Sequence, residues 1–583
     1  MKILLIHPED DPEQGPWASV PWNQIVDLGL AGTSSYARWT KRFECPVMPL
    51  AAWRNGFDDF HRVRDLMDLG CGRLIDDHGL DWWEIMSILL HGELETLILL
   101  QTFAHTIGPA DEVHVSRRGL HNSLLQFLAR ARVQVFDLRP ESQQRGLGHY
   151  LRISNKLSAA QMADVFFDKY DPGYQARGRL RHPRSPSKTP QVLLPTAYVN
   201  VSRTAIAYAQ TFPRENFLLV ATRRSGWLRQ LPENVESAWL SSYASLRDRS
   251  AENAAMEGRW RSLVGELRKV REFEILRRLG YLDSFPSRFR SGFEVRDAWR
   301  NVLEREPVQA VLCADDSNPY TRLPLLLARE RGLPNIACHH GALDGRYLFK
   351  RSYGDVIWAK GTMEEDYLAR KCGVPRKRIE IAAPAPPPQV AAVKRRDSTA
   401  FRPNILFISE AYDVSGGRTE DFYRDILPPL ADLAVTTTRK LVVKLHPAES
   451  RRERSQTLAR LLSAKQRAVV SIVSGPLTES LLESAWFGIT ILSTVAVECA
   501  IRGIPCFLCK WLESWPYEYV DQFIRFGVGI GLNSANEIER IPEQLLQYSV
   551  SPDVMKNCCQ PAASGRLREL FTGSREIFTT AAS

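Results

Sequence analysis

In the stretch LVVKLHP, residues 441–447, an apolar run suited to a buried strand delivers Lys444 and His446 at its carboxyl end. A second run, ITILSTVAVE (residues 489–498), passes from a strand directly into a helix, with Ser493-Thr494 at the junction. Ligands of open α/β sheets bind at the carboxyl ends of the strands. A helix that begins there offers backbone N–H groups to an anion. The two runs together predict an α/β domain that binds a phosphate-bearing ligand.

The composition is typical of a soluble globular protein, with 44% hydrophobic and 25% charged residues. A length of 583 residues predicts two or three domains. No stretch approaches the ~20 apolar residues of a membrane span. The first eight residues become polar too early for a signal peptide. The ten scattered cysteines favour reduced, buried thiols over a disulfide or zinc framework, so we expect a cytoplasmic protein.

The net charge of +9 is modest for this length. It fits an anionic substrate, or peripheral contact with the anionic inner face of the cytoplasmic membrane. Residues 171–190, rich in Arg, Pro and Ser, are expected to form a solvated loop or a lip over an anionic acceptor or membrane. No recognisable nucleic-acid-binding module is present, so no nucleic-acid partner is expected.

Strand and helix signals alternate along most of the chain, which predicts parallel sheets. Residues 227–305 differ, because their mostly helical and charged sequence predicts a helical insertion. The strand signals lie at 2–6, 112–116, 133–136, 191–194, 216–221, 308–314, 335–338, 355–358, 378–382, 404–408, 440–445, 468–472, 490–492 and 506–508.

A proline-rich linker at 386–403 separates two such regions, since proline blocks helix formation and stiffens the chain. We therefore expect an α/β fold with two Rossmann-like domains that face each other across a cleft. Residues 1–385 are the predicted acceptor-side domain with the helical insertion. Residues 404–583 are the predicted nucleotide-donor domain, which ends in helices.

Four residues are candidates for binding the donor. Two glycines follow the 404–408 strand, and a lysine and a histidine lie at the end of the 440–445 strand. Gly416 and Gly417 permit close approach of the backbone to a phosphate. The alternative is a plain turn, for which two adjacent glycines are common. Lys444 is costly to bury without an anion, and His446 can donate to a phosphate oxygen. The alternative for His446 is a structural role before a turn proline.

Three more donor candidates lie where the 489–498 run enters its helix. The hydroxyls of Ser493 and Thr494, with the backbone N–H groups ahead of Val495, can cap an anion. Glu498, one turn into the helix, can accept hydrogen bonds from ribose hydroxyls. The alternatives are simple N-capping and a carboxylate that stabilises the helix dipole.

Acid–base candidates lie at two neighbouring strand ends of the N-terminal domain. Asp315 and Asp316 end the 308–314 strand, where a carboxylate can remove a proton from an acceptor hydroxyl. His340 belongs to the His339-His340-Gly341 string that ends the next strand. N-capping by Asp316 or Ser317 is the alternative. Because no HExxH motif is present, we expect neither a metal nor a cofactor besides the nucleotide-sugar substrate.

These motifs resemble the GT-B glycosyltransferases of bacterial surface-polysaccharide biosynthesis. That group includes capsule Kdo transferases, sialyltransferases and teichoic-acid glycerophosphotransferases. The resemblance covers about residues 308–510. It rests on the strings His339-His340-Gly341, Tyr367 to Pro375, Lys444-Leu445-His446-Pro447, Ser493-Thr494 with Glu498, and Gly503-Ile504-Pro505.

The resemblance implies that His446, Ser493 and Thr494 contact the donor nucleotide, and that His340 or Asp316 activates the acceptor. Sialyltransferases carry an acidic-acidic-Gly motif, whereas the nearest string here is Asp76-Asp77-His78-Gly79. The expected enzyme is an inverting, metal-independent transferase. It moves a sugar to a glycan or lipid-linked acceptor of a capsule or lipopolysaccharide pathway. The alternatives are a non-hydrolysing UDP-N-acetylglucosamine 2-epimerase and a non-catalytic nucleotide-sugar-binding protein.

Overall fold

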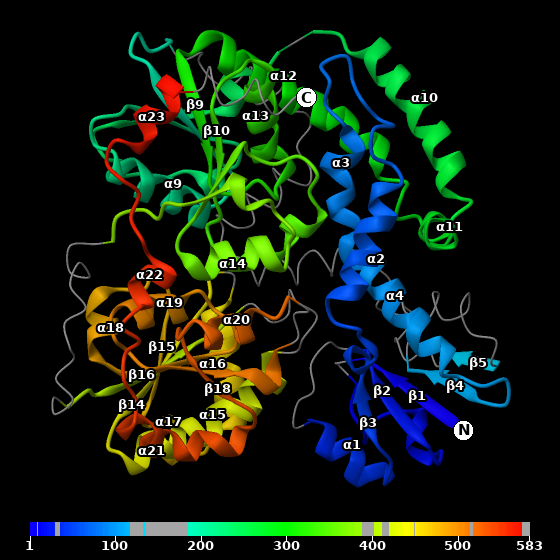
Figure 1. The fold of residues 1–583 in the computed structure, drawn as a ribbon. Coiled ribbons are helices and arrows are strands. Elements are labelled where there is room, and N and C mark those ends of the chain that lie inside the picture. The colour runs from blue at the N-terminus through cyan, green and yellow to red at the C-terminus, as the bar shows by residue number, and fades with distance from the viewer. Residues whose placement is uncertain are drawn as a thin grey trace. The chain divides into compact units, whose positions relative to one another are not determined.

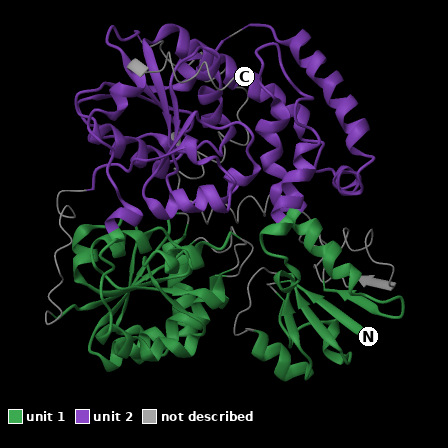
Figure 2. Cartoon of the chain, viewed as in Figure 1, with its two compact units in different colours: residues 1–59, 95–156, 388–554 green, residues 60–94, 157–387, 555–583 purple. Residues whose placement is uncertain are grey.

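Three parallel β-sheets with helices between their strands make up the computed structural model of the chain (Figure 1). The structure describes residues 1–7, 10–28, 35–116, 132–135, 185–245, 247–386, 401–410, 419–447, 449–513 and 517–573. The chain divides into two compact units (Figure 2). Unit 1 comprises residues 1–59, 95–156 and 388–554, and unit 2 comprises residues 60–94, 157–387 and 555–583.

The first sheet belongs to unit 1 and has the order β3-β2-β1-β4-β5, with all neighbouring strands parallel. Its core combines aliphatic side chains such as Leu4 and Ile25 with three buried tryptophans. β2 and β3 have only four and three residues and are not among the strands predicted from the sequence. The elements are β1 (Lys2–Ile6), β2 (Gln24–Asp27), α1 (Ser35–Phe43), β3 (Val47–Pro49), β4 (Glu112–Val115) and β5 (Arg132–Val135).

A helical region lies between β3 and β4 in the sequence. Its elements are α2 (Phe57–Asp68), α3 (Trp82–Ser87), the 3-10 turn η3 (Ile88–Leu90) and α4 (His91–His105). By length and composition, the run Trp82–His105 is apolar enough to cross a membrane, with a mean hydropathy of 1.2. No membrane span is expected here from the sequence, in which polar residues such as Glu84 interrupt the apolar run. Yet 61% of its most apolar window is buried inside the protein, and Glu84 forms a buried ion pair with Arg322.

The second sheet belongs to unit 2 and has the order β12-β11-β10-β9-β6-β7-β8. Central strands such as β6 and β7 are buried on both faces, as parallel strands covered by helices must be. Its elements are β6 (Gln191–Thr196), α9 (Val199–Thr211), β7 (Phe217–Ala221), β8 (Val235–Trp239), β9 (Val308–Cys313), α13 (Pro319–Glu330), β10 (Asn335–Ala337), β11 (Val356–Ala359), α14 (Thr362–Arg370) and β12 (Ile379–Ile381).

The helical insertion begins later than predicted. Residues 235–239 form β8, an edge strand of the second sheet, a 3-10 turn follows at Leu240–Tyr243, and the first α-helix of the insertion begins at Ser250. The helices are α10 (Ser250–Leu267), α11 (Arg271–Arg278) and α12 (Phe285–Arg305). On α12, the buried guanidinium of Arg296 pairs with Asp76 at 2.7 Å and with Glu252 at 2.5 Å. The Asp76 carboxylate is therefore part of the packing of the insertion.

The third sheet belongs to unit 1 and has the order β15-β14-β13-β16-β17-β18. β16 begins and ends earlier than the predicted 490–492 strand, and β18 is missed by the sequence analysis. The elements are β13 (Asn404–Ile408), α15 (Thr419–Thr436), β14 (Lys440–Lys444), α16 (Arg451–Leu461), α17 (Ala464–Arg467), β15 (Val470–Val473), α18 (Glu479–Ser484), β16 (Ala485–Thr490), α19 (Val495–Ile501), β17 (Cys506–Cys509), α20 (Tyr519–Arg525), β18 (Ile530–Leu532) and α21 (Ile541–Leu546).

The C-terminal helices return to unit 2, although residues 404–583 are predicted to form one domain. Here α22 (Val554–Cys558) and α23 (Arg566–Gly573) follow α21, and Leu567 and Leu570 complete the core of the second sheet. A Cβ on Gly361, at the start of α14, would lie 2.2 Å from the backbone oxygen of Asn557. Only glycine therefore lets the returning segment pack here.

All three sheets share one strand order. Numbered from its own first strand, each sheet begins 3-2-1-4-5, as in the Rossmann fold. The α/β fold with Rossmann-like domains is thus confirmed by the second and third sheets. The first sheet is an addition: residues 1–385, predicted as one domain, contain two sheets. The predicted linker at 386–403 lies mostly outside the described residues, as does most of the basic 171–190 segment.

All ten cysteines are free thiols. Cys506 and Cys509 have C-x-x-C spacing, but both lie in β17, where residues three apart point to opposite faces of the sheet. A hydrogen bond to Cys499 and burial raise the pKa of Cys506 well above its usual value. These thiols are packing residues of the third sheet.

Candidate active site

Lys444 and His446 lie together at the carboxyl end of β14, as predicted from their sequence. Lys444 is 6% exposed, and its ammonium donates to the backbone oxygen of Leu445 at 2.7 Å. His446 follows on a half-buried turn. Burial and the charge of Lys444 both lower the pKa of His446, so its imidazole is neutral near pH 7.

Glu449, which the sequence analysis does not single out, fixes the turn that carries His446. The backbone N–H of His446 donates to Glu449 Oε2 at 2.8 Å, and the N–H of Glu449 returns a bond to the oxygen of His446 at 3.0 Å. Glu449 Oε1 also accepts from Ser409 Oγ and from Arg454 Nε, each at 2.9 Å. The buried Glu449 carboxylate therefore joins the end of β13, the end of β14 and the first turn of α16. An acidic residue three positions after the histidine is the signal that was available in the sequence.

A second carboxylate, Glu410, follows β13 and contacts the end of the neighbouring strand β16. It accepts from the Thr490 hydroxyl at 2.8 Å and from the backbone N–H of Leu492 at 2.9 Å, and also from the N–H groups of Ile491 and Ser493. Burial raises the pKa of Glu410 despite these donors. The N–H groups that follow β16 are thus bonded to the protein's own carboxylate.

This arrangement corrects the predicted role of the backbone ahead of α19. The N–H groups of residues 491–493 are occupied by Glu410, and the N–H of Val495 lies 3.3 Å from Ser493 Oγ. Contact between Ser493-Thr494 and a donor therefore depends on the side-chain hydroxyls. Thr494 is exposed, and it is the N-cap residue of α19.

Glu498 is exposed and forms an ion pair with Arg502 one turn later, at 2.5 Å. The pair is the i,i+4 contact that stabilises a short helix. The structure therefore gives Glu498 a partner in its own helix, and its predicted ribose contact stays a prediction. Gly416 and Gly417 lie outside the described residues.

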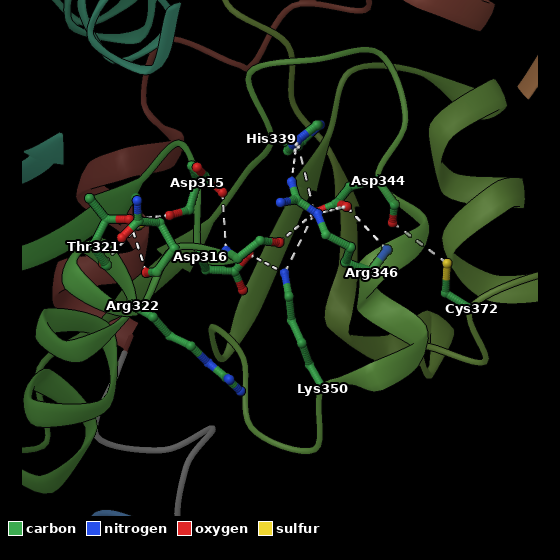
Figure 3. Close-up of polar contacts among 12 residues, drawn as sticks. Asp315, Asp316, Thr321, Arg322, His339, Asp344, Arg346, Lys350 and Cys372 are labelled. Carbon is green, nitrogen blue, oxygen red and sulfur yellow. Dashed lines mark hydrogen bonds and ion pairs between the residues drawn. The ribbon is translucent and has the colours of Figure 1, made fainter. Parts of the chain in front are cut away.

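The acid–base candidates belong to unit 2, at the carboxyl ends of the neighbouring strands β9 and β10. Figure 3 shows Asp315 and Asp316 with their polar neighbours. Asp316 Oδ1 lies 2.6 Å from the ammonium of Lys350, and these side chains are 1% and 0% exposed. Burial and the charge of Asp316 raise the pKa of the adjacent Tyr347 phenol. Asp316 is therefore one half of an enclosed ion pair.

Asp344 extends this ion pair into a network. Its carboxylate lies 3.6 Å from Lys350, and it accepts from Arg346 Nε at 2.9 Å and from Ser317 Oγ at 2.8 Å. Burial alone would raise the pKa of Asp344, but the charges of Arg346 and Lys350 hold it well below its usual range. The ionised carboxylate ties the β9 and β10 loops together.

The side chains of His339 and Lys360 fix the backbone around His340. His339 Nδ1 accepts the N–H of Gly341 at 3.1 Å, and its Nε2 lies 3.5 Å from Arg346 Nη2 and 3.9 Å from Asp344. Lys360, at the end of β11, donates to the oxygens of His339 at 2.6 Å and Gly341 at 2.8 Å. Lys360 is not among the residues predicted from the sequence. It shares the pattern that identifies Lys444, a lysine at the end of an apolar strand.

His340 itself combines the properties of a general base. Burial lowers its pKa, while the nearby charge of Asp315 acts to raise it. Its Nδ1 is buried and has no hydrogen-bond partner among the described residues. Asp315 Oδ1 accepts the backbone N–H of Ser317 at 3.1 Å, which fixes the carboxylate. A neutral imidazole beside a fixed carboxylate can take a proton from a hydroxyl.

The structure thus brings Asp315, Asp316 and His340 together in unit 2, and Lys444 with His446 in unit 1. Among the described residues, no three His, Cys, Asp or Glu side chains are grouped as metal ligands are. Metal independence stays a prediction, because it concerns the reaction.

No protein-family model and no curated protein matches the chain in sequence. Several solved structures match it in fold. A UDP-N-acetylglucosamine 2-epimerase (described as putative) from Listeria monocytogenes has a TM-score of 0.41 at 11% identity, over 66% of this chain and 96% of its own. The glycosyltransferase SnogD from Streptomyces nogalater has a TM-score of 0.39 at 13% identity, over 66% and 99%. A variant of the wall teichoic acid polymerase TagF has a TM-score of 0.38 at 11% identity, over 75% and 100%.

Proposed function

We propose that this protein is a glycosyltransferase that moves a sugar from a nucleotide-sugar donor to a glycan or lipid-linked acceptor. One observation carries the proposal. The second and third sheets have the same Rossmann order, and each has chemically suitable side chains after its strands. These side chains are His340 with Asp315 in one sheet and His446 in the other. Ligands of such sheets bind at that edge, where the strand order reverses.

The third sheet is the proposed donor side. In this proposal His446, whose backbone is held by Glu449, donates to a phosphate oxygen of the nucleotide, and Lys444 supplies positive charge at the same strand end. The hydroxyls of Ser493-Thr494 add two further donors. Together these groups stabilise the negative charge that develops on the departing phosphate.

The second sheet is the proposed acceptor side. His340 takes the proton of the acceptor hydroxyl, whose oxygen attacks the anomeric carbon while the bond to the nucleotide phosphate breaks. Asp315 stabilises the imidazolium that results. Asp316 is the second candidate for the base, but its enclosure with Lys350 supports a structural role. Single displacement of this kind inverts the anomeric configuration and requires no metal.

Further parts of the proposal rest on the motif resemblance. They are a role in surface-polysaccharide biosynthesis and a cytoplasmic site of action. The net charge of +9 supports an anionic acceptor or contact with an anionic membrane surface.

The first test is a thermal-shift panel of CMP, UDP, GDP and CDP on the full chain, because a product nucleotide stabilises the folded state by mass action. One nucleotide is expected to raise the melting temperature. In His446→Ala that shift should disappear, and transfer from the corresponding nucleotide sugar should fall at least about 100-fold. The matched control is His105→Ala, at an exposed position, for which both readouts should stay unchanged.

Turnover assays on the same protein separate the alternative functions. Conversion of UDP-N-acetylglucosamine without any acceptor would identify an epimerase. Nucleotide binding without turnover, for any acceptor, would identify a binding protein. Unchanged binding and turnover in His446→Ala would contradict the donor site proposed here.

A further inference from the structure

The second sheet carries another group of polar residues at its point of strand reversal. β9 and β6 are neighbours there, and the chain continues from them into α13 and α9, respectively. Tyr198 directly precedes α9, and Asn318 directly precedes α13. Asn318 Nδ2 donates to the Tyr198 hydroxyl at 3.1 Å, so the two loops are joined at this junction. Ligands bind at such junctions in open α/β sheets.

A guanidinium lies at the same place. Arg223, on the loop after β7, donates from Nη1 to the Tyr198 hydroxyl at 2.9 Å. Its guanidinium carbon lies 5.1 Å from the ring centre of Tyr198 and 5.3 Å from that of Tyr320. Two aromatic rings therefore hold the cation by cation–π attraction. Because Tyr198 is 38% exposed, solvent and solutes reach this cluster.

The loop that carries Arg223 is fixed by its own contacts. Ser225 Oγ donates to the oxygen of Ala197 at 3.0 Å, and Ser202 Oγ donates to the oxygen of Gly226 at 2.6 Å. A Cβ on Gly226 would lie 3.1 Å from the carbonyl carbon of Ala197, so the backbone of the loop approaches the β6 end closely. A guanidinium on such a fixed loop loses little conformational entropy when it binds a ligand.

An aromatic pair follows on the same edge. Trp227, four residues after Arg223, stacks on Trp239 at the end of β8, with ring centres 4.6 Å apart and planes 1° apart. Both side chains are partly buried. A rigid aromatic surface in the same loop as a cation is typical of sites that hold the apolar and the charged part of one ligand.

We propose that this arginine cluster binds an anionic group on the acceptor, a carboxylate or a phosphate. The arginine cluster consists of Tyr198, Arg223, Asn318 and Tyr320. The planar guanidinium matches either anion in two parallel hydrogen bonds. That the ligand is an acceptor rests on the proposed function. Binding of the anion itself requires no turnover. An acidic sugar or a phosphate-linked glycan unit is the ligand class that carries such a group.

The test is ligand-observed NMR on the full chain without any nucleotide, using saturation transfer to glucuronate, glycerol 3-phosphate and glucose. We expect transfer to at least one anion and none to glucose. In Arg223→Gln the affinity for that anion should fall at least about tenfold, because two charge-assisted hydrogen bonds are lost. Arg229→Gln, at an exposed position six residues on, is the matched control and should bind like the parent. Tyr198→Phe, which keeps the ring but removes the hydroxyl, should weaken binding several-fold.

Which anion binds distinguishes a carboxylate ligand from a phosphate ligand. Equal binding by Arg223→Gln and the parent would overturn the proposal, as would binding of glucose alone or of no probe. If Arg223→Gln fails to fold, the Tyr198→Phe variant decides instead: anion binding equal to that of the parent would overturn the proposal. The thermal shift with nucleotide is measured on the same samples. If the nucleotide shift is absent while the anion still binds, the proposed function is contradicted. The proposal that the arginine cluster binds an anion is then unaffected.

Discussion

The ammonium of Lys350 lies 2.6 Å from a carboxylate oxygen of Asp316, and neither side chain is more than 1% exposed. A buried ion pair depends on both partners, because removal of one leaves an uncompensated charge in a medium of low dielectric constant. Lys350 also lies 3.6 Å from Asp344. One cation therefore forms ion pairs with two carboxylates in the loops that carry the proposed base.

Lys350→Met should destabilise unit 2 strongly, because Asp316 and Asp344 lose their shared cation. We expect a loss of about 3–5 kcal/mol, the usual consequence of breaking a buried pair. Urea unfolding followed by tryptophan fluorescence measures it. Lys377→Met, at an exposed position, should change stability by less than about 0.5 kcal/mol. Equal midpoints for the two variants would show that the ion pair is dispensable.

His340 should determine the acidic limb of the pH–rate profile. Burial lowers its pKa, so kcat/KM should fall with decreasing pH only below the ordinary histidine value of ~6.5. His340→Asn should remove that limb and lower kcat/KM at least about 100-fold. In Asp315→Asn the limb should move to lower pH, because the charge of Asp315 raises the pKa of His340. A limb that persists in His340→Asn would assign the base to another residue.

Glu449→Gln should weaken donor binding while the fold is retained. Glutamine keeps one oxygen for the N–H of His446 but loses the ion pair with Arg454, so the turn is held less firmly. We expect KM for the nucleotide sugar to rise about tenfold, with a smaller change in kcat. Glu483→Gln, at an exposed position, is the control. A fall in kcat at constant KM would contradict a role in holding the donor.

Glu513 should make the stability of unit 1 depend on pH. Burial raises its pKa from 4.5 to about 7, so the folded state keeps a proton that the unfolded chain has released. Stability from this group therefore falls as pH rises through this window, by up to about 3 kcal/mol. Glu513→Gln should gain stability over the parent between pH 5 and pH 8, as measured by thermal unfolding. Exposed Glu539→Gln should follow the parent, and parallel curves for all three proteins would refute the prediction.

Gly361→Ala should loosen the C-terminal segment. Its Cβ would lie 2.2 Å from the oxygen of Asn557, which is backbone and has no room to yield. We expect proteases to cleave the chain faster after residue 554. Mass spectrometry of the fragments over time measures the cleavage rate. Gly258→Ala in α10 meets open space and should be neutral or gain up to about 1 kcal/mol. Identical cleavage rates for the two variants would count against the predicted clash.

The strand ends could be predicted from sequence because they depend on local patterns. β13 matches the predicted 404–408 strand, and Lys444 and His446 lie where the apolar run places them. The partners of the site residues follow no local pattern. Lys350 is 34 positions from Asp316, and Glu410 is 82 positions from Leu492. Such pairs form only when strands separated in sequence become neighbours in a sheet.

The sequence by itself therefore determined the α/β class, most strands and the chemistry at their ends, because apolar periodicity and strand-end polarity are properties of short segments. The tertiary structure alone decided that the described residues form three sheets and that residues 555–573 return to unit 2. It also decided that Asp316 is enclosed, while Nδ1 of His340 has no hydrogen-bond partner within the part of the chain that the structure describes. The physical reason is that burial and ion pairing depend on packing between distant segments. Whether a carboxylate is a base or half of a buried ion pair is decided by its neighbours in space.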